Sequence, residues 1–218
     1  MPVYEAARAN MIESQIRPNK VTDERVIGAF ARVHRELFAP EALRGVAYID
    51  EDLPLGGGRY LMAPMIVARL LQAAEIDSKD TVLVVGAGVG YEAALASLLG
   101  RNVVALEENA DLARTGRDAL VEDQIGSVAY VEEPLKAGHK ARAPYDVIFF
   151  GGSIAAVPAE IENQLAEGGR LLAIVRPGGM MGRATVITRT GGVFARRVIF
   201  DAAVPLLPGF EPKPAFVF

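Results

Sequence analysis

Three glycines at every second position are the part of this sequence with the clearest chemical use. Gly86, Gly88 and Gly90 follow the apolar run Thr81–Val85 and precede a helix-like segment, Tyr91–Leu99. Glycine lets the backbone adopt positive φ and approach a ligand closely, because it has no Cβ. The amides at the start of the following helix favour anionic or electron-rich groups. The spacing therefore predicts a loop that holds a nucleotide-like cofactor.

An acidic residue follows where the sugar of such a cofactor would lie. The run Val103–Leu106 predicts a second strand, and Glu107 comes at its carboxyl end. A carboxylate in that position can accept hydrogen bonds from two ribose hydroxyls. We therefore expect an adenosine to bind between the glycine loop and Glu107.

The place of the third glycine narrows the choice of cofactor. Dinucleotide loops usually read G-x-G-x-x-G and leave room for a pyrophosphate. Here Gly90 comes one residue early, and Tyr91 takes the expected place. The pattern G-x-G-x-G resembles the S-adenosylmethionine loop of class I methyltransferases, which binds no phosphate. A nicotinamide-dependent oxidoreductase is the alternative, and the lack of a recognisable hydride-site partner argues against it.

The elements that must hold these residues alternate between strand and helix from Thr81 onward. After the glycine loop and Glu107, the predicted helices are Asn109–Val121 and Pro158–Ala166, and the predicted strands are Ser127–Val131, Asp146–Phe150 and Arg170–Val175. Such alternation predicts a parallel sheet covered by helices on both faces. Two last strands, Ala184–Arg189 and Val193–Phe200, have only three residues between them. They predict an antiparallel hairpin.

The N-terminal third predicts a helical extension to this sheet. Apolar residues recur at helical spacing over Tyr4–Ile16, and Asp23 can cap a second helix that ends before Pro40. The stretch Tyr48–Tyr60 is irregular and glycine-rich, and Pro64 suits the first turn of a third helix. We expect one domain over residues 1–218, with a helical extension and substrate-side loop at 1–76 and a cofactor-binding core and closing hairpin at 77–218. The position of the proline-rich end, 205–218, stays open between packing over the cleft and packing against a neighbour.

Composition excludes several other classes of protein. A chain of 218 residues, 51% of them hydrophobic, is long enough to bury the core of one α/β domain. The formal net charge of −4 gives no general attraction for nucleic acid. There is no cysteine for a disulfide or a thiolate, and His34 and His139 lack the spacing of metal ligands, so no metal is expected. The N-terminus has no secretory signal and no apolar run approaches ~18 residues, so we expect a cytoplasmic protein without membrane contact.

Six segments, taken in order, carry a resemblance that covers nearly the whole chain. They are Met11–Pro40, Leu53–Pro64 (LPLGGGRYLMAP), Val82–Ala94 (VLVVGAGVGYEAA), Ala143–Phe150, Glu160–Val175 and Val204–Leu206. The first three resemble the N-terminal helices, the loop before the first core helix and the cofactor loop of the protein-L-isoaspartate O-methyltransferases. The last three are similar to later segments of that family in order and spacing.

The resemblance implies an α/β fold with a doubly wound, mostly parallel, Rossmann-like methyltransferase sheet. It implies methyl transfer from S-adenosylmethionine to the carboxylate of an isoaspartyl residue in a damaged protein or peptide, with S-adenosylhomocysteine as the product. By the same resemblance Gly86, Ala87 and Gly88, in the loop that ends at Gly90, lie against the methionine part of the cofactor. Glu107 binds the ribose, and Glu133 lies near the adenine. We expect a monomer, with a dimer as the alternative.

The proposed reaction needs few titratable groups. A carboxylate with a pKa near ~4 is already ionised at neutral pH, so the acceptor needs no general base. The enzyme must place an oxygen at ~3 Å from the methyl group and exclude water.

Two residues of the substrate-side loop bear on that placement. Met62 stands where the family has its serine, and a thioether cannot donate a hydrogen bond to a carboxylate. Residues two apart in an extended segment face the same side, so the phenol of Tyr60 could supply the donor, unless Tyr60 serves as an aromatic wall. Gly151 and Gly152 likewise replace the family's Thr-Ala after the fourth strand. The alternative function is therefore a diverged member that binds S-adenosylmethionine but methylates another acceptor or is catalytically weak.

Overall fold

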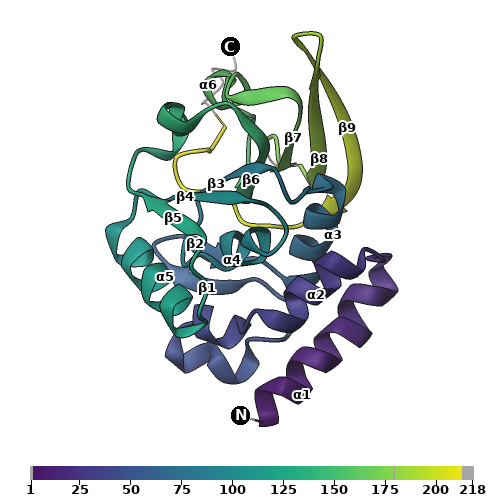
Figure 1. Ribbon diagram of the computed structural model, residues 1–218, viewed down its shortest axis with the longest axis vertical. Helices are drawn as coiled ribbons and strands as arrows, with labels where there is room; N and C mark the ends of the chain where they lie inside the picture. Colours follow the sequence, from purple (N-terminus) through teal and green to yellow (C-terminus); the bar gives the residue numbers. More distant parts are fainter. Residues whose placement is uncertain (1, 179, 213–218) are drawn as a thin grey trace.

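A seven-stranded sheet forms the centre of the part of the chain that the computed structural model describes, residues 2–178 and 180–212 (Figure 1). The strand order is β5-β4-β3-β6-β7-β8-β9. The strands are β3 (Thr81–Val85), β4 (Asn102–Leu106), β5 (Val128–Val131), β6 (Tyr145–Ile154), β7 (Leu165–Val175), β8 (Gly182–Thr190) and β9 (Val193–Ala202). The first five pair in parallel and the last two are antiparallel. The expected doubly wound, mostly parallel sheet with a closing hairpin is confirmed.

Each face of the sheet packs on its own apolar cluster. In β3, Val82 and Val84 belong to one cluster and Leu83 and Val85 to the other. Helices α3 (Pro64–Ala74), α4 (Tyr91–Ser97) and α5 (Ala110–Glu122) contribute to the first cluster, and the short helix α6 (Ala159–Glu162) contributes to the second. Strands buried on both faces carry apolar residues without a polar break, as the run Thr81–Val85 predicted.

The sheet has its topological switch point between β3 and β6. From β3 the chain first continues to β4 on one side and later returns to β6 on the other. In such sheets the carboxyl ends of the strands on either side of the switch point form a ligand crevice. Here those ends are followed by Gly86, Glu107 and the second half of β6, which brings the predicted cofactor residues to one edge of the sheet.

The N-terminal helices differ in detail from the expected ones. Helix α1 (Pro2–Met11) passes into a π-helical turn at Ile12–Ile16. Helix α2 (Glu24–Arg32) is capped as expected, since the Asp23 side chain accepts a hydrogen bond from the amide of Arg25. It stops well before Pro40, and two 3-10 turns, Arg35–Phe38 and Glu41–Val46, follow. None of the helices within residues 2–178 and 180–212 has both the length and the apolar character needed to cross a bilayer.

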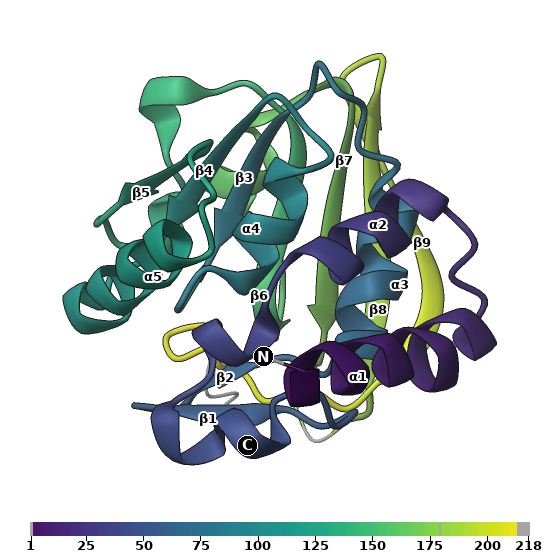
Figure 2. The same ribbon diagram turned by 60° about the horizontal axis from the view of Figure 1, so that its bottom comes forward.

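Two segments differ from the secondary structure that the sequence predicts. The stretch expected to be irregular contains a two-stranded antiparallel hairpin, β1 (Leu53–Gly56) and β2 (Arg59–Leu61), with Gly57 and Gly58 at positive φ in its turn. The helix expected over Pro158–Ala166 is reduced to α6, because Leu165 already pairs with Tyr145 as the start of β7. Figure 2 shows the β1–β2 hairpin at the edge toward which the arrows of β3, β6 and β7 point.

Candidate functional site

The glycine loop that leaves β3 has no side chain of its own at three positions. Gly86, Gly88 and Gly90 have φ of +73°, +54° and +87°, a region that other residues rarely adopt. The amides of Gly86 and Ala87 donate to the carbonyl of Leu106, at 2.9 and 3.0 Å, which ties the loop to the end of β4. These two bonds fix the loop against the neighbouring strand, and we call its segment Gly86–Gly88 the shelf.

Glu107 lies fully buried next to this shelf. Its Oε2 accepts a hydrogen bond from the amide of Gly88 at 2.7 Å, and its Oε1 accepts one from the amide of Asn109 at 2.9 Å. A buried carboxylate needs such partners, because an unpaired charge in the protein interior is very costly. The sequence expectation that Glu107 and the glycine loop come together is met by this geometry.

A third donor to Glu107 comes from the substrate-side hairpin. The guanidinium of Arg59 donates from Nη1 to Oε1 of Glu107 at 2.7 Å and from Nη2 to the carbonyl of Gly86 at 2.8 Å. Arg59 is itself only 6% exposed. It is not among the residues that the sequence predicts for this site. The signal for it is the alternation of β2, which buries Arg59 and Leu61 and leaves Tyr60 between them exposed.

The C-terminal tail closes the cleft from the other side. Leu206 forms a β-bridge with Ser153, and the amide of Leu207 donates to the carbonyl of Ser153 at 2.8 Å. The Leu207 side chain lies over the glycines, since a Cβ built on Gly86 would meet its Cδ2 at 2.9 Å and one on Gly152 would meet its Cγ at 2.7 Å. A hollow of only about 10 Å³ remains between the hairpin, the tail and β6. That is space for one water molecule at most.

Comparison with known proteins identifies the family to which this architecture belongs. The family model described as protein-L-isoaspartate(D-aspartate) O-methyltransferase matches residues 6–203. A protein-L-isoaspartate O-methyltransferase of Methanoculleus marisnigri is 37% identical over 203 residues, which cover 93% of this chain and 92% of that one. The chain belongs to the protein-L-isoaspartate(D-aspartate) O-methyltransferase family. A relative from Aeropyrum pernix with the same name is also 37% identical, over 94% of this chain and 80% of its own.

Solved structures agree on the fold. A protein-L-isoaspartate O-methyltransferase superposes with a TM-score of 0.80 at 22% identity and covers 94% of this chain and 67% of its own. A Plasmodium falciparum protein described as a protein-L-isoaspartate O-methyltransferase, solved in complex with S-adenosyl-L-homocysteine, superposes with a TM-score of 0.78 at 19% identity. It covers 94% of this chain and 97% of its own. The fold is therefore that of the S-adenosylmethionine-dependent methyltransferases, as the sequence resemblance implied.

The family uses S-adenosylmethionine, and the chemical groups of this site are of the types that bind an adenosine. The shelf formed by Gly86 and Gly88 has no Cβ, and the Glu107 carboxylate lies at the carboxyl end of β4. Side chains of the same chain nevertheless fill the space above the shelf: a Cβ on Gly86 would lie 3.2 Å from Nη2 of Arg59 as well as against Leu207. A ligand placed against Gly86 would meet the side chains of Arg59 and Leu207.

Tyr60 and Met62 lie together beside the remaining hollow, with Gly151 and Gly152 opposite them. Met62 is fully buried and its carbonyl accepts a hydrogen bond from Nη2 of Arg35 at 2.9 Å. The Tyr60 side chain is 36% exposed. Both residues line the hollow, but Tyr60 is exposed and Met62 is buried, so their sharing of one side stays a prediction. Of the two, only Tyr60 carries an O–H that can donate.

Glu133 contacts a histidine, and Gly90 faces a tyrosine. The carboxylate of Glu133 contacts Nδ1 of His139 at 2.9 Å, and within the part of the chain described no hydrogen bond joins it to the glycine loop. A Cβ on Gly90 would collide with the hydroxyl of Tyr130, which donates to the carbonyl of Gly88 at 3.1 Å. The third glycine thus makes room for a tyrosine of β5 that braces the loop.

One buried glutamate next to the site has a strongly raised pKa. Glu92, in the first turn of α4, is 4% exposed, and burial raises its pKa to about 7, while its own backbone amide and the charges of Arg35 and Arg59 oppose the rise. Burial likewise lowers the pKa of Arg35, whose guanidinium lies 4.9 Å from the ring centroid of Tyr91. The interior behind the glycine loop therefore contains ionisable groups whose charged forms are disfavoured by burial.

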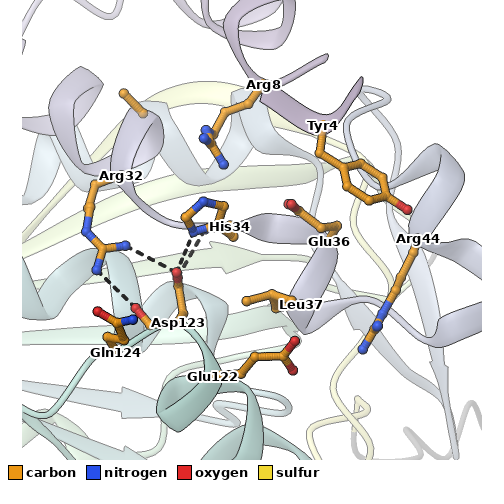
Figure 3. Close-up of a pocket in the computed structure, with 11 residues that line it drawn as sticks. Tyr4, Arg8, Arg32, His34, Glu36, Leu37, Arg44, Glu122, Asp123 and Gln124 are labelled. Atoms are coloured by element: carbon orange, nitrogen blue, oxygen red, sulfur yellow. Dashed lines mark hydrogen bonds and ion pairs between the residues drawn. The ribbon is translucent and has the colours of Figure 1, made fainter. Parts of the chain in front are cut away.

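A second hollow lies among the N-terminal helices, with a volume of about 770 Å³ (Figure 3). Asp123 on its wall accepts hydrogen bonds from Nδ1 of His34 at 2.5 Å and from Nη1 of Arg32 at 3.2 Å. These contacts join the end of α2 to the end of α5, about 20 Å along α5 from its N-cap beside Glu107, given the rise of an α-helix. We assign this cluster a structural role in docking the two helices.

Proposed function

We propose that this protein is an S-adenosylmethionine-dependent methyltransferase that methylates the carboxylate of isoaspartyl residues in damaged proteins or peptides. The placement of Glu107 beside the Gly86–Gly88 shelf, in a chain that matches this family over residues 6–203, carries the proposal. The proposed cofactor contacts are the backbone of Gly86, Ala87 and Gly88 and the carboxylate of Glu107.

The chain's own residues have a limited chemical task in this reaction. The bound cofactor supplies an electrophilic methyl group. An acceptor carboxylate with a pKa near ~4 is ionised at neutral pH and attacks without a general base. The residues around the small hollow, Tyr60, Met62, Gly151 and Gly152, must hold that carboxylate in line and keep water away.

Tyr60 is the residue we propose for binding the acceptor. Tyr60 is partly exposed, and it lines the same hollow as the buried Met62, which stands at the position of the family's serine. A hydrogen bond to a charged group is worth ~1.5–3 kcal/mol, so losing one slows the reaction by roughly 10–150-fold. The variant Tyr60→Phe should show that loss in kcat/KM while it still binds S-adenosylhomocysteine. Equal rates for the variant and the wild type would mean that the phenol has no role in the reaction.

Transfer of tritiated methyl groups tests the proposal as a whole. The substrate is an isoaspartyl peptide, and the matched control is the same sequence with a normal aspartyl linkage. We expect base-labile incorporation into the isoaspartyl peptide alone. Equal incorporation into both peptides, or incorporation into neither, would contradict isoaspartyl specificity.

The second candidate is a diverged member that binds the same cofactor and acts on another acceptor or acts weakly. Met62 favours it, because a thioether cannot donate to a carboxylate, and so does the filled space above the shelf. Binding of S-adenosylhomocysteine without transfer to either peptide would select this candidate.

We also propose that residues 1–76 and 77–218 are one folding unit and that the protein acts as a cytoplasmic monomer. Phe30 and Phe38 of the N-terminal part pack on Tyr91 of α4, with ring centroids 6.1 and 5.6 Å apart. The absence of cysteine suits a reducing compartment. A single unfolding transition, a monomer mass in sedimentation and recovery in the cytoplasmic fraction are the expected results.

A further inference from the structure

Arg59 occupies the two groups of the site that an adenosine would approach, the Glu107 carboxylate and the Gly86 carbonyl. We infer that Arg59, together with Leu207, is an internal plug of the cofactor cleft, which must leave before the cofactor binds and which therefore sets its affinity. The inference rests on the proposed function, because it concerns the same cleft.

The contacts of Arg59 resemble those of a bound ligand. Its two terminal nitrogens each make a hydrogen bond of less than 3 Å, one to a fully buried carboxylate. Glu107 keeps two backbone donors, Gly88 and Asn109, when Arg59 leaves. Ribose hydroxyls can replace the third donor, so exchange of Arg59 for the ligand leaves the carboxylate satisfied. Without a ligand, however, opening removes a partner from a buried charge and is unfavourable.

The second residue of the plug, Leu207, comes from the C-terminal tail. Leu207 lies over Gly86 and Gly152 and is fixed through Ser153, whose amide donates to the carbonyl of Pro205 at 3.1 Å. The hairpin and the tail also meet each other, since a Cβ on Gly58 would lie 3.3 Å from Cγ of Pro208. Because the two segments touch both the cleft and one another, they hold the closed form together.

The turn that precedes Arg59 is rich in glycine. The β1–β2 turn contains three glycines in a row, all at positive φ, and a Cβ on Gly56 or Gly57 would meet nothing within 4 Å. This turn can therefore change its backbone angles without side-chain clashes.

The consequence for binding follows from mass action. When only a fraction of the molecules is open, the apparent Kd equals the intrinsic Kd divided by that fraction. A closed form that outnumbers the open form by about ten to one thus weakens binding about tenfold. Variants that weaken the plug should bind more tightly although they lose contacts.

Calorimetry with S-adenosylhomocysteine on the full chain tests the inference. The variants are Arg59→Gln, which removes the charge, and Leu207→Ala, which removes the apolar half and remains informative if the first variant fails to fold. The control is Arg25→Gln, an exposed arginine on α2. We expect Kd to fall in both plug variants, by up to about tenfold for a closed form in tenfold excess, and to stay unchanged in the control. The melting temperature without ligand should fall in Arg59→Gln, and the rise on adding ligand should exceed that of the wild type.

The possible failures are distinguishable. Equal affinity in the wild type and both plug variants would overturn the plug and leave the proposed function standing. Weaker binding in Arg59→Gln would also overturn it, since Arg59 would then be a cofactor contact. Absence of binding in every chain would overturn both the plug and the proposed cofactor.

Discussion

Replacing the buried Glu92 by glutamine should change how the stability of the protein depends on pH. Glu92 has an ordinary pKa of 4.5 in the unfolded chain and a pKa of about 7 in the folded protein, where burial favours the neutral carboxyl. Because the folded pKa is raised, the contribution of this group is fully present below pH ~4.5 and is lost as the pH rises through about 7.

The size of the effect follows from the same two values. A pKa that rises from 4.5 to about 7 on folding lowers the free energy of unfolding by about 3 kcal/mol at pH 8, relative to acidic pH. Glu92 is buried enough that solvent does not screen this effect. Glutamine keeps the shape of the side chain and cannot ionise. The free energy of unfolding of Glu92→Gln should therefore rise relative to that of the wild type by about 2–3 kcal/mol between pH 5 and pH 8.

Urea unfolding at pH 5, 6, 7 and 8 measures this difference directly. The matched control is Glu5→Gln on the exposed surface of α1, which should run parallel to the wild type. Parallel curves for Glu92→Gln and the wild type would refute the reasoning, because they would mean that the carboxyl titrates alike in the folded and unfolded chains.

Three further substitutions, one of them with a matched control, test local conformation and packing. Gly28 lies in the exposed face of α2 with open space around its Cβ position, so Gly28→Ala should raise the free energy of unfolding by about 0.5–1 kcal/mol in urea titrations. The Asn109 side chain caps α5, and Asn109→Ala should lower the unfolding free energy by about 1 kcal/mol, while an unchanged value would mean that the cap contributes nothing. A Cβ on Gly116 would collide with the hydroxyl of Tyr130, so Gly116→Ala should cost about 1–3 kcal/mol, whereas Gly126→Ala, in open space, should cost little.

The core strands of the sheet could be predicted from the sequence because their signal is local. Thr81–Val85 is a strand over its predicted range, and the predicted Val103–Leu106 differs from β4 by one residue. Four apolar residues in a row, Val82–Val85, indicate a strand buried on both faces. The N-cap Asp23 and the helix start at Pro64 were predictable for a similar reason, since a cap acts on the next three residues.

The filled cleft could not be predicted, because it depends on contacts between distant segments. Arg59 is 48 positions from Glu107, and no period or cap relates the two. The hairpin that orients Arg59 was itself hidden by the glycines at 56–58, which are typical of irregular loops as well as of turns. Of the tail whose position the sequence left open, Leu206 and Leu207 pack over the cleft. Residues 213–218 lie outside the described residues.

A crystal structure of the protein with S-adenosylhomocysteine tests the central claim most directly. The account predicts adenosine on the Gly86–Gly88 shelf, with ribose hydroxyl oxygens about 2.5–3.0 Å from the Glu107 carboxylate and the Arg59 guanidinium withdrawn from it. A ligand bound elsewhere, with Arg59 still paired to Glu107, would contradict the account.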